Sequence, residues 1–200
     1  MMLRPLALLT AMLALSLSAS AENTSTYTTY DLDKCRVISE PAQDEEFAGT
    51  WGCAGYQNKP DYQIVFSEGD LRSLVSFGKD GKTHCAASET FGGFNSVNNT
   101  VEWRAKDGKP FAAIQRWRVS YDPDDSSKIR EWLVVTRIEP GNSCHIGYVL
   151  GALPKANELA RTLADSVAAT TSCMAAERVV LGFAGRDWSE TPGGPACPQN

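Results

Sequence analysis

The feature that most constrains this chain is a series of strand-like segments that short turns separate between residues 100 and 150. Each segment is rich in β-branched and aromatic residues, which is typical of β-strands. Connections this short leave no room for a crossover, so successive strands must be antiparallel neighbours. The predicted strands of this block are TVEWRA (100–105), FAAIQRWRVSY (111–121), IREWLVVTRI (129–138) and CHIGYVL (144–150).

Turn signals extend this pattern. The motif KDGK occurs at 79–82 and at 106–109, and its Asp-Gly step predicts hairpin turns because glycine accepts a positive φ. The pair Asn98-Asn99 predicts a third hairpin, since asparagine also tolerates that conformation. The sequence therefore predicts a curved or barrel-like antiparallel meander of about six to eight strands. Its earlier strands are RVIS (36–39), YQIVF (62–66) and LRSLVSF (71–77).

One helix is expected after the meander, over residues 155–172. Leu159, Leu163 and Val167 recur at every fourth position, and alanines flank them. This spacing places an apolar stripe on one side of a helix. The predicted fold class is therefore α+β, with one C-terminal helix packed on an antiparallel sheet.

The N-terminus has the pattern of a secretory signal peptide over residues 1–21. Arg4 precedes an apolar run at 6–19, and Ala19-Ser20-Ala21 is a small-residue cleavage site. The run is too short to span a bilayer, and no second long apolar run follows, so no membrane span is expected. The net charge is −5 and no basic stretch is present, which argues against nucleic acid as a partner.

The rest of the chain divides into three expected parts. A polar, loose leader covers residues 22–30, and a single α+β domain covers 31–173. A C-terminal extension follows over 174–200. It contains a possible last strand at 178–185 and a Pro/Gly-rich irregular arm at 186–200.

Six cysteines in an exported chain predict up to three disulfides. A strand at 144–150 is about 20 Å long and a helix at 155–172 is about 27 Å long. A helix that returns along that strand brings Cys173 close to Cys144. The expected pairs are Cys144–Cys173, Cys35–Cys53 and Cys85–Cys197.

The alternative pairing is Cys85–Cys144, which would bring His84 and His145 together on the opposite face. Two imidazoles without an evident carboxylate make a weak metal site. We therefore expect no metal or other cofactor, and we expect both histidines to lie beside disulfides without a chemical role.

The two faces of the central strands differ in character. Trp103, Trp117 and Trp132 share one face, which predicts a core, with an aromatic ligand cleft as the alternative. The other face carries arginines and glutamates. It predicts either a solvated face with cross-strand ion pairs or a reader of anions and carboxylates. The candidate anion-binding residues are Arg104, Arg116, Arg118 and Arg137.

Two aromatic residues complete the candidate site. Trp51 and Tyr56 belong to WGCAGY (51–56), which we interpret as a disulfide-tethered turn or a binding loop. No nucleophile elbow, zinc-protease motif, phosphate-binding loop or dinucleotide fingerprint occurs. Acids such as Glu68, Asp70, Glu102 and Glu131 are available for glycoside cleavage, but no local signature supports a pair. No catalytic residue is therefore assigned.

Several segments resemble a family of small exported proteins of alphaproteobacteria that has no established activity. The resemblance covers about residues 26–173, and it implies an envelope protein without implying any catalytic or binding residue. The segments that carry it are YDLDKC, WGCAGY, EGDLRSLVSFG, FNSVNNTVEWR, LVVTRI, CHIGYV and NELARTLADSVA.

The expected function is that of a periplasmic or secreted, non-enzymatic binding protein of the bacterial envelope. Its partner would be an envelope protein or a small anionic ligand, and inhibition of a wall-degrading enzyme is one concrete version. The alternative is a periplasmic hydrolase that acts on an envelope glycan or peptide.

Overall fold

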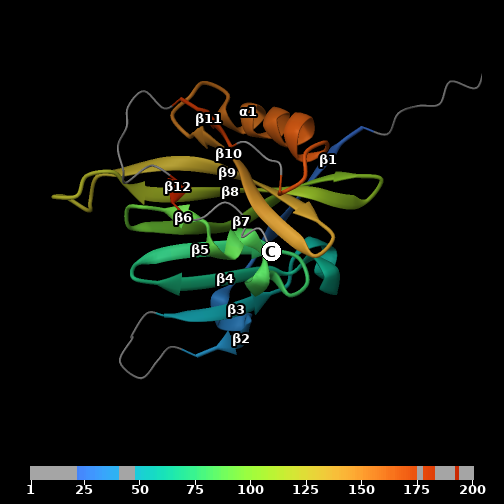
Figure 1. Cartoon of the computed structure of the whole chain (residues 1–200), viewed down its shortest axis with the longest axis horizontal. Coiled ribbons are helices and arrows are strands. Elements are labelled where there is room, and N and C mark those ends of the chain that lie inside the picture. The colour runs from blue at the N-terminus through green and yellow to red at the C-terminus, as the bar shows by residue number, and fades with distance from the viewer. Residues whose placement is uncertain (1–21, 41–47, 175–177, 183–191, 194–200) are drawn as a thin grey trace, which may run out of the picture.

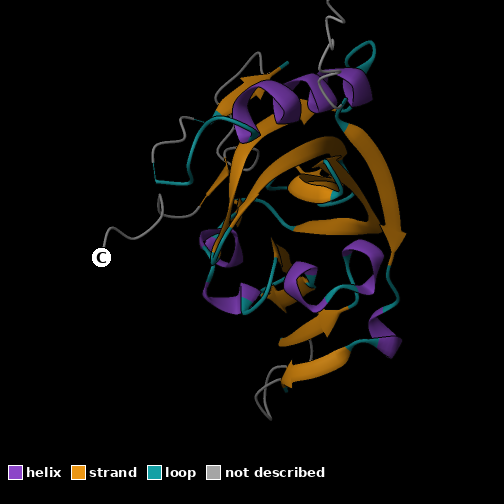
Figure 2. Cartoon of the chain, turned by 90° about the vertical axis from the view of Figure 1, so that its right-hand side faces the viewer, coloured by secondary structure: helices purple, strands orange, loops and turns teal. Residues whose placement is uncertain are grey.

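The protein forms three layers, with helix α1 above a large sheet and a small sheet below it (Figure 1). The computed structural model describes residues 22–40, 48–174, 178–182 and 192–193. Seen from the side, the large sheet curves strongly between the helix and the small sheet (Figure 2). The sheets do not close into a barrel, so the α+β prediction is confirmed with a curved, open sheet.

The large sheet has six strands in the order β1-β7-β8-β9-β10-β11. Neighbours are antiparallel except β10 and β11, which are parallel. The run from β7 to β10 is the predicted meander, because each strand pairs with the next one along the chain. The bounds are β1 Thr24–Thr29, β7 Asn95–Lys106, β8 Lys109–Ser120, β9 Ile129–Glu139, β10 Asn142–Leu150 and β11 Val179–Leu181.

The small sheet has four strands in the order β2-β3-β4-β5, and all its neighbours are antiparallel. Strands β12 and β6 form a separate two-stranded antiparallel sheet. The bounds are β2 Arg36–Ser39, β3 Gly49–Cys53, β4 Ile64–Gly69, β5 Arg72–Phe77, β6 Thr90–Phe91 and β12 Pro192–Gly193. Short 3-10 helices cover Leu32–Lys34, Tyr56–Asn58, Pro60–Tyr62, Gly81–Thr83 and Cys85–Ser88.

Helix α1 (Ala156–Leu163) continues as a π-helical segment over Ala164–Ala168. The buried residues of α1 are Ala156, Ala160 and Leu163, so its buried side is richer in alanine than the predicted stripe of Leu159, Leu163 and Val167. Small side chains let a helix approach a sheet closely. The approach is close at Gly147, where an added Cβ would lie 2.2 Å from Leu163 Cδ2.

The main core fills the space between the two sheets. Trp103, Trp117 and Trp132 are fully buried there, which confirms the prediction that this face of the central strands is core. Phe77 of β5 contacts the Trp103 ring at a centroid distance of 5.4 Å. Tightly packed aromatic pairs of this kind hold the two sheets in one orientation.

The second core lies between the large sheet and α1, and it includes Cys144 and Ile146 of β10. Strict alternation along the strand would place Tyr148 on that same face, but Tyr148 lies in the main core instead. A register shift between His145 and Gly147 explains the difference. An irregularity of this kind reverses the alternation of side chains beyond it.

Three predictions of local structure are wrong. The expected loose leader contains β1, whose threonine-rich residues 24–29 pair with β7 and gain a full ladder of backbone hydrogen bonds. Asn98 and Asn99 lie within β7, in a bulge between Val97 and Val101, and form no hairpin.

The KDGK motif at 79–82 leads into a 3-10 helix, because no strand follows to pair with β5. The same motif at 106–109 forms the predicted hairpin turn between β7 and β8. There both Asp107 and Gly108 adopt a positive φ.

Two of the three expected disulfides are present, Cys35–Cys53 and Cys144–Cys173. The alternative Cys85–Cys144 pairing is therefore wrong, and the helix returns to β10 as predicted. Cys85 is disulfide-bonded as well, and its expected partner Cys197 lies outside the described residues. The expected signal peptide at 1–21 and most of the expected arm at 186–200 also lie outside them. No helix in the described part of the chain is long and apolar enough to cross a bilayer.

Candidate functional site

The arginine-bearing face of the large sheet is the face that α1 covers. Arg104 is buried there, and its Nε and Nη2 donate to Asp165 of the helical segment at 2.9 and 2.6 Å. Its Nη1 also donates to Ser25 Oγ at 2.6 Å. A bidentate pair of this kind uses the planar fork of the guanidinium fully. Arg104 therefore joins the helix to the sheet.

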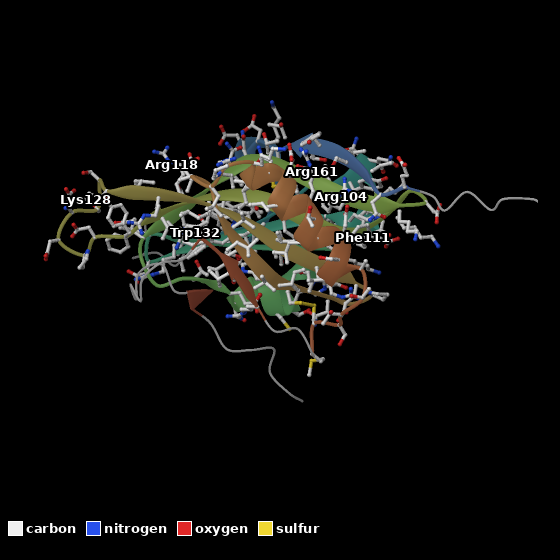
Figure 3. The ribbon with its side chains drawn as sticks, turned by 90° about the horizontal axis from the view of Figure 1, so that it is seen from above. Arg104, Phe111, Arg118, Lys128, Trp132 and Arg161 are labelled. Carbon is white, nitrogen blue, oxygen red and sulfur yellow. A yellow bond between two sulfur atoms is a disulfide. The ribbon has the colours of Figure 1, made fainter. Side chains whose placement is uncertain are left out.

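A second ion pair runs beside the first with the charges exchanged. Arg161 of α1 donates to Glu102 of β7, from Nε at 2.6 Å and from Nη2 at 3.3 Å. This hydrogen bond raises the pKa of Arg161 further above its usual range. Ser25 hydrogen-bonds to Glu102 as well as to Arg104, so it connects the two pairs. Arg104 and Arg161 lie side by side along the helix in Figure 3.

The remaining predicted arginines do not converge on one point. Arg116 Nη1 donates to Glu131 Oε2 across the β8–β9 pair at 2.8 Å. Arg137 donates to Glu139 at 2.8 Å and to a backbone carbonyl of the helical segment. Arg118 is exposed and lies toward the β8–β9 hairpin (Figure 3). The structure thus favours ion pairs within the chain over a single anion reader.

The two aromatic candidates, Trp51 and Tyr56, pack against other aromatic side chains of the protein. Tyr56 is buried, with its ring 6.0 Å from that of Trp103. Trp51 is partly buried in β3 and packs on Phe66 at 5.7 Å. WGCAGY is therefore a strand and a disulfide-tethered turn, the first of the two interpretations from the sequence.

Both histidines are buried in separate hydrogen-bonded settings. His84 Nδ1 lies 3.2 Å from the Phe77 carbonyl and 3.2 Å from Ser143 Oγ. His145 Nδ1 lies 3.1 Å from Tyr148 Oη, and burial lowers the pKa of His145 to about 4. Disulfide bonding removes the neighbouring cysteines as metal ligands. Among the described residues, no cluster of three or more His, Cys, Asp or Glu side chains could hold a metal.

A cavity of about 740 Å³ lies between the first half of β7 and the strands β4 and β5. We call it the acidic cleft. Tyr30, Phe66 and Val97 give it an apolar and aromatic lining, while Asp31, Asp33 and Glu68 supply carboxylates. A cleft of this volume is within the range of small-molecule and side-chain binding sites. Its other lining residues are Thr29, Leu32, Lys34, Ser73, Ser96 and Asn99.

The bulge in β7 builds the inner wall of this cleft. Its displaced carbonyls are satisfied locally, because Tyr30 N donates to Asn99 O at 3.0 Å and Gln115 Nε2 donates to Asn98 O at 2.7 Å. Gln115 Nε2 also donates to Tyr30 Oη at 3.0 Å. Because Tyr30 Oη is the acceptor in this bond, its own O–H group is not used in it. Burial raises the pKa of Tyr30 to about 12, so the proton stays in place at neutral pH.

The carboxylates of the cleft have contrasting surroundings. Burial raises the pKa of Glu68, because it disfavours the charged form of the carboxyl group. Hydrogen bonds from Lys34 and from the Asp33 amide lower the pKa of Asp31. Asp33 and Glu68 form no hydrogen bond through their side-chain oxygens within the described residues. The carboxylate oxygens of Asp33 and Glu68 are therefore available to a ligand that donates hydrogen bonds or carries positive charge.

Sequence reasoning missed most of this cleft. Glu68 was considered only as one acid among many, and Tyr30, Asp31 and Asp33 were not candidates. The visible signal is the acidic Tyr30-Asp31-Leu32-Asp33 string at the end of an unrecognised strand. Comparisons with protein-family models, curated proteins and solved structures found no match to this chain. Function is therefore inferred from these residues alone.

Proposed function

We propose that this protein is an exported, non-enzymatic binding protein of the bacterial envelope and that the acidic cleft is its partner site. The observation that carries the proposal is the cleft itself, with carboxylates around an aromatic lining. Concave sites with a few convergent polar groups are the usual form of binding sites. The disulfides support an oxidising compartment, either the periplasm or the cell exterior.

The chemistry of the cleft favours a positively charged group on the partner. Asp33 and Glu68 offer free carboxylate oxygens, and Tyr30 and Phe66 offer ring surface to an aliphatic stem. A lysine or arginine side chain matches both properties, because its stem is apolar and its head is cationic. The net charge of −5 would also speed encounter with a basic protein. A basic wall-degrading enzyme held by an inhibitor is one such partner.

The test is site-directed photo-crosslinking in the periplasm combined with partner capture. Benzoylphenylalanine in place of Ser96, an exposed residue of the cleft, should give an adduct with one envelope protein. The same probe in place of Asp124, in the β8–β9 hairpin, should give none. Adducts of equal yield at both positions would contradict the assignment of the cleft.

A charge-matched pair of variants tests the chemistry. The double variant Asp33→Asn/Glu68→Gln should lose the captured partner, because it removes both free carboxylates. The control Asp107→Asn/Asp124→Asn removes two exposed carboxylates in hairpin turns and should retain it. Capture by the first variant at the level of the wild-type protein would show that the cleft carboxylates are not involved.

One observation favours the alternative class, a hydrolase. Glu68 has a raised pKa and Asp31 a lowered pKa in one cleft, and opposite shifts of this kind are typical of acid and base pairs. Under this alternative, purified envelope glycan would release soluble fragments with wild-type protein and none with Glu68→Gln. No release by the wild-type protein would eliminate glycan hydrolysis.

A further inference from the structure

A second, smaller cavity of about 190 Å³ lies on the other side of the β7 bulge, next to the start of α1. We call it the side pocket. Ile114 of β8 and Leu133 of β9 form an apolar floor, and both side chains are almost fully buried. The volume corresponds to about six water molecules at about 30 Å³ each. The pocket therefore suits a molecule much smaller than the occupant of the acidic cleft.

One wall of the side pocket carries a positive charge with unused donors. Arg116 Nη1 donates to Glu131 Oε2 at 2.8 Å and Nη2 donates to Asn157 Oδ1 at 3.3 Å. A guanidinium has five N–H groups, so three remain after these two bonds. The side chain of Arg116 is 28% exposed and that of Glu131 is 49% exposed, so water weakens their attraction. Arg116 can therefore donate hydrogen bonds to a second carboxylate.

The facing wall carries the carboxylate of Glu102, which is paired with Arg161. Glu102 Oε1 accepts the short bond from Arg161 Nε, whereas Oε2 accepts only the 3.3 Å bond from Arg161 Nη2. Oε2 thus keeps a lone pair for another donor. Tyr27 Oη lines the same wall and accepts from Arg161 Nη2 at 3.0 Å. An ammonium group would find two oxygen acceptors here.

The register sets the spacing between the two walls. Glu102 pairs with Ile114 across β7 and β8, and Arg116 is two residues further along β8 on the same face. Such diagonal neighbours are about 7–8 Å apart at the backbone. Opposite charges at this spacing, above an apolar floor, fit one small molecule that carries both an ammonium and a carboxylate.

Simple ions fit this pocket less well. A simple anion at Arg116 would also face the Glu102 carboxylate of the pocket, and a simple cation at Glu102 would also face the Arg116 guanidinium. A zwitterion places each charge beside its opposite.

We propose that the side pocket binds a free α-amino acid, with its carboxylate on Arg116 and its ammonium on Glu102. Its side chain rests on Ile114 and Leu133. The proposal does not depend on the function of the acidic cleft, because none of these residues lines that cleft.

The test is a titration of the isotope-labelled protein with valine, followed by the backbone amide signals of Ile114, Leu133 and Asn157. Valine at up to about 10 mM should shift these signals to saturation. N-Acetylvaline lacks the ammonium and valinamide lacks the carboxylate, so each should bind at least about tenfold more weakly.

Two variants on the same strand separate the pocket from its surroundings. Arg116→Gln should weaken valine binding about tenfold or more, whereas Arg118→Gln, with the same charge change at an exposed position, should leave it unchanged. Glu102→Gln, checked for folding by near-UV circular dichroism, should weaken binding of valine. It should leave binding of N-acetylvaline unchanged, because that compound has no ammonium for Glu102 to hold.

Three results would overturn the proposal. They are absence of saturable shifts with valine, equal binding of valine and both blocked analogues, and undiminished binding of valine by Arg116→Gln.

Discussion

Arg104 offers the sharpest test of how helix α1 is held. We expect Arg104→Met to lower the free energy of unfolding by about 2–3 kcal/mol. Removing one partner of a buried ion pair costs about 3–5 kcal/mol, because the other charge stays buried alone. The Arg104 side chain is 8% exposed but that of Asp165 is 31% exposed. Water can therefore solvate the orphaned carboxylate in part, which places the expected loss below that range.

The double variant Arg104→Met/Asp165→Leu should recover most of this loss. Replacing both charges with apolar side chains of similar volume is often neutral, since no desolvated charge remains. The expected coupling energy between Arg104 and Asp165 is therefore about 2 kcal/mol in a double-mutant cycle. Urea unfolding followed by circular dichroism measures each corner of the cycle. Arg118→Met is the control and should change stability by less than about 0.5 kcal/mol, because Arg118 is exposed.

A loss below about 1 kcal/mol for Arg104→Met would refute this reasoning. It would mean that the bond to Asp165 contributes no more than a surface ion pair. A coupling energy near zero with a large single-variant loss would point instead to packing of the arginine stem.

Three further predictions concern packing, crosslinking and pH. Gly147→Ala should destabilise the protein by about 1–3 kcal/mol in urea unfolding, because the new methyl group would overlap Leu163. Replacing Cys144 and Cys173 by Ala should cost about 3.5 kcal/mol, the loop entropy for a sequence separation of 29, measured against the disulfide-intact wild-type protein. Burial lowers the pKa of His145 from 6.5 to about 4, so below pH 6.5 the unfolded chain binds a proton that the folded chain resists. Stability should fall by up to about 3 kcal/mol between pH 6.5 and 4, and His145→Gln should remove that part of the fall.

The strands and the main core were predictable from the sequence for a simple reason. Period-two patterns report which residues share a face, and Trp103, Trp117 and Trp132 lie on unbroken stretches of pairing. The pairing Cys144–Cys173 was predictable because strand and helix lengths nearly match, so the chain returns to its starting point. Both inferences depend on regular geometry alone.

The bulges were not predictable from the same patterns. A bulge leaves no mark in the amino-acid composition of a strand. The bulge in β10 nevertheless places Tyr148 on the opposite face, and the bulge in β7 holds Asn98 and Asn99 within a strand where a turn was predicted. The acidic cleft and the side pocket both adjoin the β7 bulge, so they were missed with it.

The arginine face illustrates the second limit. The sequence alone does not specify which charged residues of α1 meet Glu102 and Arg104, because that depends on how the helix lies across the sheet.

The burial of the large sheet on both faces has a practical consequence for labelling this protein. Side chains of β8 and β9 belong to the second core on one side and to the main core on the other, so most of them cannot carry a fluorophore. The β8–β9 hairpin projects beyond both layers (Figure 1), and Pro123, Asp124 and Ser127 are exposed there. A dye at Ser127 would sit outside the lining of both the acidic cleft and the side pocket. It would leave each pocket open to the ligand whose binding it reports.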